Sequence, residues 1–233
     1  MRQLVLMTLL FSSLLAKVYM GKIEPIQSYN IFSQTSGEII FIDTDKEHSV
    51  VNGTLLKIDA SIEKIQQDAY LKQQKNYKRQ MKIKYNEYKK VKNMTALNQV
   101  DKDALRISIL DLEYKLNDLE LKLSELKNTL KHKAITVENL YLRQFFVNKH
   151  DYVTVGQKVA ELSDISKAKI VIYVHKDDMH SLRTKKIHIN AEPTQAKIIK
   201  IARTPDDTYV SSYKIELQLK SDKFGEIVKI EFK

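Results

Sequence analysis

In the middle of the chain, leucine and isoleucine recur at alternating steps of four and three residues over more than three heptads. Such a sustained repeat is the a/d pattern of a coiled-coil helix, whose packing face is one apolar stripe. Asp111 precedes Lys115 by four residues, an arrangement that favours a solvated outer face. The pattern predicts a helix over residues 99–131 with a seam formed by Leu105, Ile109, Leu112, Leu116, Leu119, Leu123, Leu126 and Leu130.

A looser apolar stripe precedes this helix and predicts another one over residues 61–92. Asn98 followed by Asp101 resembles a helix N-cap with an acidic third residue, which leaves residues 93–97 as the turn. Two helices of similar length joined by so short a turn must run antiparallel, as a hairpin with arms of roughly 45 to 55 Å. The stripe of the first arm consists of Ile62, Ile65, Ala69, Tyr77, Met81, Tyr85, Tyr88 and Val91.

Segments with strand character flank the hairpin on both sides. Residues 36–42 and 50–59 are expected to be strands around a turn at Asn52 and Gly53. An internal repeat matches the spacing of Val50, Gly53, Leu56 and Asp59 before the hairpin to that of Val153, Gly156, Val159 and Leu162 after it. Later strands, with the period-2 alternation of a half-buried sheet, are expected at residues 197–201, 212–219 and 226–232.

The N-terminus has the features of a targeting segment. Arg2 is followed by an uncharged, mostly apolar run over residues 3–16, about as long as the apolar region of a signal peptide. The run is shorter than the ~20 residues that a helix needs to cross a bilayer, but it approaches that length at Met20 if Lys17 snorkels. We expect residues 1–20 to be an export signal or a retained membrane anchor, and a buried helix of a cytosolic protein is the other interpretation.

Composition narrows these expectations. Neither Gly nor Pro occurs over residues 54–155 of the 233-residue chain, as a long helical stretch requires. The absence of cysteine excludes disulfides, thiolate metal sites and cysteine nucleophiles. The formal net charge of +10 admits nucleic acid, an anionic membrane or an acidic protein as partner. Residues 72–92 hold nine Lys or Arg against Glu87 alone, but the tyrosines between them fall on the predicted seam, so we expect no nucleic acid partner.

Two half-motifs of the lipoyl or biotinyl type, split by a helical hairpin, resemble the periplasmic adaptors, or HlyD-like membrane fusion proteins, of tripartite efflux and secretion systems. The resemblance covers nearly the whole chain. It implies an α+β fold, in which a lipoyl-like barrel-sandwich hybrid is interrupted by a long antiparallel coiled-coil hairpin and followed by a small β-barrel domain. Residues 164–174 resemble the strand that leads into this barrel. The implied order is a signal peptide or membrane anchor at residues 1–20, the first half of the lipoyl-like domain at 21–59, the hairpin at 60–133, the second half at 134–166 and the β-barrel domain at 167–233.

The same resemblance implies a structural role in the periplasm, at the inner membrane. The chain would form a homo-oligomer, a hexameric ring by resemblance, that bridges an inner-membrane transporter of the resistance-nodulation-division type to a TolC-like outer-membrane channel. An adaptor of an ATP-driven secretion or metal-export system, a coiled-coil scaffold without a transport role and a carrier subunit of an enzyme are the alternatives.

The free tip of the hairpin is the expected contact with the channel. Many adaptors carry an Arg, a Leu and a Ser there, and by position these fall on Glu87, Val91 and Asn98. Only Val91 keeps the chemical character of the family residue, since it is apolar like Leu. Apolar residues at a turn that has no core of its own often mark an interaction site. The predicted docking residues are Val91, Met94, Leu97 and Asn98.

Catalytic and cofactor chemistry is not expected. A lipoyl or biotinyl carrier needs a lysine in the turn between its half-motifs. In this chain the helical hairpin is inserted at that turn, after Asp59 and Ala60. One cluster of side chains suits a divalent metal, but its spacing is the only evidence for a metal site. The resemblance places this cluster in a short turn, where polar residues cap the backbone. No nucleophile, phosphate loop or paired-carboxylate motif stands out, so we predict no cofactor, no metal and no enzymatic activity. The cluster consists of His175, Asp177, Asp178, Met179 and His180.

Overall fold

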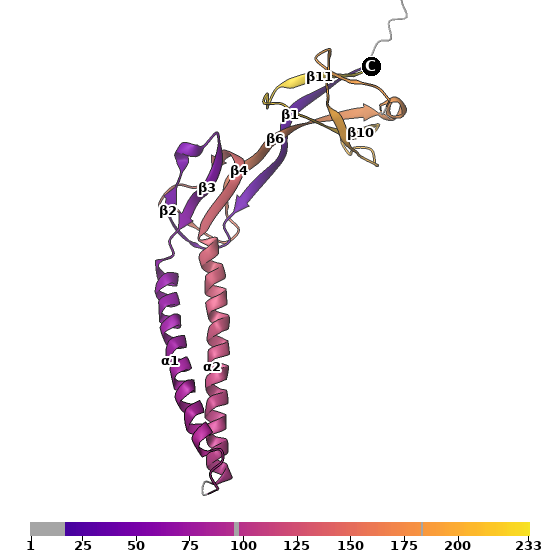
Figure 1. Ribbon diagram of the computed structural model, residues 1–233. Helices are drawn as coiled ribbons and strands as arrows, with labels where there is room; N and C mark the ends of the chain where they lie inside the picture. The colour runs from indigo at the N-terminus through magenta and orange to yellow at the C-terminus, as the bar shows by residue number, and fades with distance from the viewer. Residues whose placement is uncertain (1–16, 96–97, 183) are drawn as a thin grey trace, which may run out of the picture. The chain divides into compact units, whose positions relative to one another are not determined.

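Two long helices interrupt a succession of strands (Figure 1). The computed structural model describes residues 17–95, 98–182 and 184–233. Helix α1 (Ser61–Val91) and helix α2 (Gln99–His132) end within a residue of the predicted limits, which are thereby confirmed. Asn98 caps α2, because its side-chain oxygen accepts a hydrogen bond from the backbone N–H of Val100 at 3.3 Å, and this too was predicted.

The strands are mostly short, but two of them, β1 and β6, are long. Two short 3₁₀ helices, η1 (Thr44–Lys46) and η2 (Lys176–Ser181), follow β2 and β6 in the chain. The strands are β1 (Val18–Phe32), β2 (Gly37–Ile42), β3 (Ser49–Ile58), β4 (Ala134–Phe145), β5 (Tyr152–Val153), β6 (Lys158–His175), β7 (Ile187–Ile189), β8 (Glu192–Pro193), β9 (Lys197–Ile201), β10 (Ser212–Leu219) and β11 (Ile227–Phe232). The strands predicted at residues 197–201, 212–219 and 226–232 are confirmed as β9, β10 and β11.

The chain divides into two compact units. The hairpin unit comprises Asn30–Glu138 and Leu142–Ala160, and therefore contains both helices. The C-terminal unit comprises the described residues up to Tyr29, together with Asn139–Tyr141 and Glu161–Lys233. Each unit has a core of its own.

In the hairpin unit, strands from both sides of the helices share one core. Strand β2 pairs antiparallel with β3 before the helices and with β5 after them, so that Gly37 lies opposite Val153. Because the two flanks bury their apolar residues against each other, neither forms this core alone. The buried residues are Ile39, Leu56, Ile58, Val147, Val153 and Val159.

The turn predicted at Asn52 and Gly53 is wrong. Strand β3 continues through both residues, and the connection from β2 to β3 is instead made by the segment that contains η1. Gly53 has a φ of +105°, which a strand accommodates at a glycine without a turn. The repeat is also imperfect, because Val50 is 48% exposed whereas Val51 is buried.

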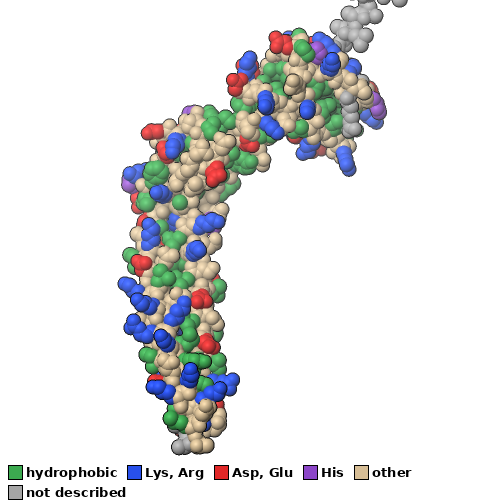
Figure 2. Space-filling model, in the orientation of Figure 1, with side chains coloured by type: hydrophobic (Ala, Val, Ile, Leu, Met, Phe, Trp, Pro, Cys, Tyr) green, Lys and Arg blue, Asp and Glu red, His purple; other side chains and the backbone are tan. Residues whose placement is uncertain are grey.

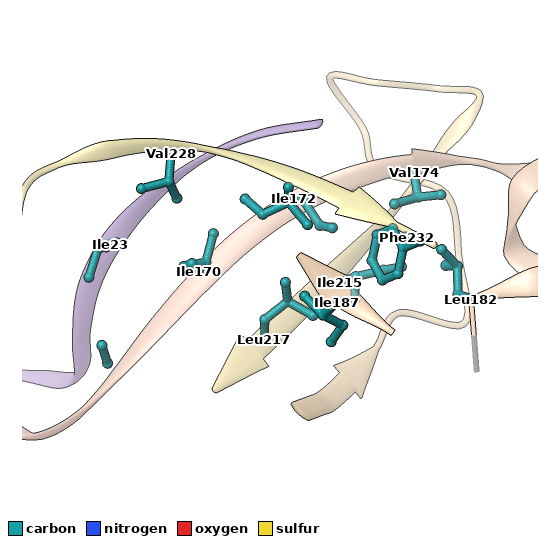
Figure 3. Packing of buried hydrophobic residues seen from close by; sticks show 12 residues of the cluster. Ile23, Ile170, Ile172, Val174, Leu182, Ile187, Ile215, Leu217, Val228 and Phe232 are labelled. Carbon is teal, nitrogen blue, oxygen red and sulfur yellow. The ribbon is translucent and has the colours of Figure 1, made fainter. Parts of the chain in front are cut away.

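In the C-terminal unit, antiparallel strands follow the order β9-β10-β6-β1-β11-β7-β8. Strands from both ends of this order contribute to the same core, which Figure 3 shows from close by. Alternate residues of β6 and β10 point into it, as the period-2 pattern requires. The buried residues labelled there are Ile23, Ile170, Ile172, Val174, Leu182, Ile187, Ile215, Leu217, Val228 and Phe232.

Strand β1 departs from the sequence-based division of the chain. Residues 1–16 of the predicted signal or anchor lie outside the described residues, but residues 18–20 begin β1. Val18 to Lys22 pair with Ile227 to Glu231 of β11, so the C-terminal unit includes an N-terminal strand as well as residues 167–233. A partner more than 200 residues away leaves no local signal in the sequence.

The start of β1 is also tied to η2 by polar contacts. Asp178 accepts hydrogen bonds from Lys17 Nζ at 2.7 Å and from the Tyr19 hydroxyl at 3.0 Å. The hydrogen bond from Lys17 holds the pKa of Asp178 below its ordinary value. Burial, and then the hydrogen bond to Asp178, raise the pKa of Tyr19 to about 12. Both groups therefore keep their charge states at neutral pH.

Candidate functional site

Helices α1 and α2 lie side by side (Figure 1). The eight predicted seam residues lie on one face of α2. Ile109, Leu112, Leu116, Leu119 and Leu126 are buried. Leu105, Leu123 and Leu130 are half-buried. At about 1.5 to 3 kcal/mol for each fully buried side chain, this stripe is the main source of contact energy between the helices.

The face that α1 turns toward α2 differs from the predicted one in its first half. Ile62 and Ile65 are 74% and 71% exposed, and in the second half Tyr85 is 59% exposed as well. The half-buried positions of α1 are Glu63, Gln67, Tyr70, Gln74, Tyr77, Met81, Lys84, Glu87, Tyr88 and Val91.

Polar side chains therefore occupy much of this face. Gln74 donates a hydrogen bond to Glu120 of α2 at 3.3 Å, and Gln73 donates one to the Tyr77 hydroxyl at 2.9 Å. Side chains of this kind have an apolar stem or ring as well as a polar end, so they can lie on an apolar face while their ends form hydrogen bonds. Because a search for hydrophobic residues overlooks glutamine, the sequence placed the stripe on the wrong side of this half of α1.

A buried lysine joins the helices to the sheet of the hairpin unit. The Lys133 side chain is 7% exposed, and its Nζ lies 2.7 Å from Glu63 Oε1 and donates a hydrogen bond to the Ser36 carbonyl at 3.0 Å. Burial alone would raise the pKa of Glu63, but the hydrogen bond and the charge of Lys133 outweigh it and hold that pKa below its ordinary value. Lys133 has no signal of burial in the sequence, since nothing in its neighbours indicates it.

Beside this lysine, Gly37 has a φ of +150°, and a Cβ there would lie 2.7 Å from Ile58 Cγ2 and 3.3 Å from Lys133 Nζ. Only glycine fits this approach without displacing a neighbour. The contacts link β2, the start of α1 and the end of α2, so this junction fixes where the two helices leave the sheet.

A second apolar stripe on α2 is exposed. Val100, Ile107, Tyr114 and Leu121 follow one another at intervals of seven residues and are 68%, 65%, 75% and 61% exposed. A seven-residue repeat of bulky uncharged side chains is the pattern by which helices pack on other helices. We call these four residues the outer stripe. Their regular spacing was readable in the sequence, where the stronger leucine seam concealed it.

The two helices differ in charge. Residues 72–92, nearly all of them in α1, carry nine Lys or Arg and one acid, whereas α2 carries seven Asp or Glu and six Lys or Arg. Lys115 and Lys122 pair with Asp111 and Asp118 on the same helix. Figure 2 shows Lys and Arg side chains along the helices, with apolar side chains exposed between them.

The structure describes three of the four predicted docking residues at the tip. Met94 is 49% exposed, Val91 is half-buried and Asn98 is exposed, with its side chain engaged in the cap of α2. Leu97 lies outside the described residues. Lys89, Lys90 and Lys92 are exposed close by. The tip thus presents an apolar side chain next to several cations.

The residues of the predicted metal cluster have other contacts. His175 caps η2 by accepting from the backbone N–H of Asp177, and Asp178 faces Lys17 and Tyr19. Within residues 17–95, 98–182 and 184–233, no three His, Asp or Glu side chains come close enough together to hold a metal ion. In the same part of the chain, no helix combines the length and apolar character needed to span a membrane.

Comparison with known proteins finds similar folds among solved structures. No protein-family model and no curated protein sequence matches the chain. Its structure is similar to the membrane fusion protein Spr0693 from Streptococcus pneumoniae R6, with 12% identity over 94% of this chain and 99% of that chain and a TM-score of 0.72. It is also similar to MacA from Actinobacillus actinomycetemcomitans, with 15% identity over 93% of this chain and 78% of that chain and a TM-score of 0.72.

A further similarity is to a putative efflux transporter from Bacteroides eggerthii, with 14% identity over 93% of this chain and 68% of that chain and a TM-score of 0.65. At these identities the likeness concerns the fold. The resemblance to membrane fusion proteins that the sequence predicted is confirmed at that level, and the chain has their α+β fold.

Proposed function

We propose that the protein is a structural adaptor of an efflux system and has no catalytic role. It would be held in the periplasm at the inner membrane and connect an inner-membrane transporter, of the resistance-nodulation-division type, to a TolC-like outer-membrane channel. The proposal rests on the pair of 31- and 34-residue helices. The pair is joined to the sheet through the buried Lys133–Glu63 contact and ends in a partly apolar tip. At 1.5 Å per residue, each helix spans roughly 45 to 50 Å, a length suited to bridging.

The tip is the proposed site of contact with the channel. Met94 is exposed where the two helices meet and has no core to cover it, and the three neighbouring lysines supply a basic rim. A small apolar contact within a charged rim is the usual arrangement of a protein interface. The basic rim favours an acidic rim on the channel.

Met94→Asp should reduce crosslinking of the chain to its channel at least tenfold, because a desolvated carboxylate would replace the apolar contact; tenfold corresponds to about 1.4 kcal/mol. The experiment uses cells that express the chain with its own transporter and channel, and measures the yield of a crosslink formed from Lys92. Met94→Leu is the matched control and should retain crosslinking. If Met94→Asp folds, reaches the membrane and crosslinks like the unchanged protein, the docking role of the tip is excluded.

The outer stripe supports assembly of several copies side by side. We propose that it packs on α1 of a neighbouring copy, because a seven-residue repeat of bulky exposed side chains suits packing on another helix. Such a contact joins two different surfaces, and repetition of it closes a ring when the rotation fits. A ring of six copies is the arrangement that the family resemblance implies.

Ile107→Asp combined with Tyr114→Asp should abolish self-association, since both side chains are exposed in the single chain and would be buried between copies. Analytical ultracentrifugation at increasing protein concentration measures this. The pair Ile107→Leu and Tyr114→Phe is the control and should associate normally. Association that survives the aspartate pair, in a protein with an unchanged melting temperature, would contradict this role of the outer stripe.

A further inference from the structure

A groove in the C-terminal unit is lined by cations along a free strand edge. Its volume is about 780 Å³, and the buried residues Leu182 and Ile187 are part of its lining. All five residues of β9 line it. Because successive residues of a strand face opposite sides, a groove that meets every one of them follows the strand's edge. Its charged lining residues are Lys185, Lys186, Lys197, Lys200 and Arg203.

The groove continues into a second hollow of about 450 Å³, with which it shares Thr194, Ala196 and Lys197. This hollow adds Lys167 and Lys220 to the lining. Neither hollow has an Asp or Glu among its lining residues. The positive charge therefore extends along the whole of β9.

The lysines of the groove differ from others in the same unit. Lys214 forms an ion pair with Glu216 on the same strand, and Lys233 forms one with Glu231 of β11. In the part of the chain that the structure describes, none of the five cations of the larger groove has an ion-pair partner. Lys200 lies opposite Glu216 in the pairing of β9 with β10, but Glu216 forms its ion pair with Lys214. The excess of cations along the groove is a cost that an anionic partner would relieve.

Strand β9 also has an unpaired edge. Among the described strands it pairs only with β10, where Lys197 lies opposite Gln218 and Ile201 opposite Ile215. An edge of this kind presents backbone N–H and C=O groups that another extended chain can pair with, and lysines on it discourage neutral strands. The same lysines attract a strand that carries carboxylates. Ile199, which is 45% exposed, offers an apolar contact between them.

We infer that this groove binds an acidic extended segment of another protein, which adds to β9 as a further strand. The cations are spread along β9, whose five residues span about 16 Å at ~3.3 Å per residue, and beyond it to Arg203, and they match a line of carboxylates better than one compact phosphate. The inference does not depend on the adaptor role, because none of these residues belongs to the helices.

The test uses the purified full chain and a synthetic seven-residue peptide of alternating valine and glutamate. We expect the peptide to bind and to slow amide hydrogen exchange at residues 197–201, which pairing with the edge requires. The same peptide with its backbone amides methylated should bind at least tenfold more weakly. Equal binding of both peptides, or binding without protection of β9, would overturn the inference.

Substitutions separate this site from general attraction to a basic protein. Lys197→Glu with Lys200→Glu should weaken peptide binding at least tenfold. Lys22→Glu with Lys229→Glu is the matched control, since these exposed lysines lie on β1 and β11 of the same unit, and it should change binding less than twofold. Equal losses in both variants would refute the site. Tighter binding of a single-stranded oligonucleotide or of phosphatidylglycerol vesicles than of the peptide would likewise refute the proposed occupant.

Discussion

Replacing Leu116 and Leu119 together by alanine should lower the free energy of unfolding of the helical pair by about 4 kcal/mol. The two side chains are 6% and 3% exposed and lie in the middle of the seam. Leu→Ala costs about 2 to 5 kcal/mol in a closed core, and we expect the lower end at each site because an interface of two helices is open on its sides. Urea titration followed by circular dichroism at 222 nm measures the loss, since both helices contribute to that signal.

The matched control is Leu110→Ala with Leu121→Ala on the same helix. These leucines are 54% and 61% exposed, so their truncation should change the stability by no more than about 0.5 kcal/mol each when measured in dilute protein. Equal destabilisation by the two pairs would show that the leucine seam does not hold the helices together. The same control variant tests the outer stripe at high concentration, where Leu121 is proposed to contact a second copy.

Glu63→Ala should destabilise the hairpin unit by about 3 kcal/mol, because it leaves the buried ammonium of Lys133 without its carboxylate. Lys133→Met should cost less, since the Glu63 side chain is 21% exposed and can regain contact with water. The double variant should lose less than the sum of the single variants, because the two groups interact directly. Thermal unfolding of the four proteins gives this interaction energy, and strict additivity would contradict a coupled pair.

The pH dependence of the same contact has a definite sign. The pKa of Glu63 is lower in the folded protein, so its contribution is fully present above the unfolded pKa of about 4.3 and is lost as the pH falls through the folded value. The stability advantage of the unchanged protein over Glu63→Gln should therefore be constant near pH 7 and shrink below about pH 4. An advantage that does not change down to pH 3 would show that the charge of Glu63 contributes nothing.

Local patterns predicted much of the secondary structure but less of its pairing. The limits of α1 and α2 and the strands β9 to β11 followed from periodicity and capping. The first half of α1 was placed on the wrong face, because Ile62 and Ile65 are more hydrophobic than Gln67 and Gln74, yet the glutamines lie nearer α2. The choice between these faces depends on the shape of the neighbouring helix.

The candidate functional residues, too, were predictable from the sequence only in part. The apolar character of the tip at Met94 was visible in the sequence, whereas the open groove along β9 depends on which strands remain unpaired. Lys185 and Lys197 are twelve positions apart and read as ordinary surface lysines. Their common lining of one groove is a property of the folded sheet.

By itself, the sequence determined the two helices, the leucine seam of α2 and the alternation of the later strands, because each depends on residues within one or two turns or pleats of one another. Only the tertiary structure decided that β1 pairs with β11, that Lys133 is buried against Glu63 and that β9 keeps a free edge. The physical reason is that pairing, burial and the exposure of an edge are set by contacts between segments far apart in the chain. A lysine has the same local sequence signal whether such a contact covers it or leaves it in water.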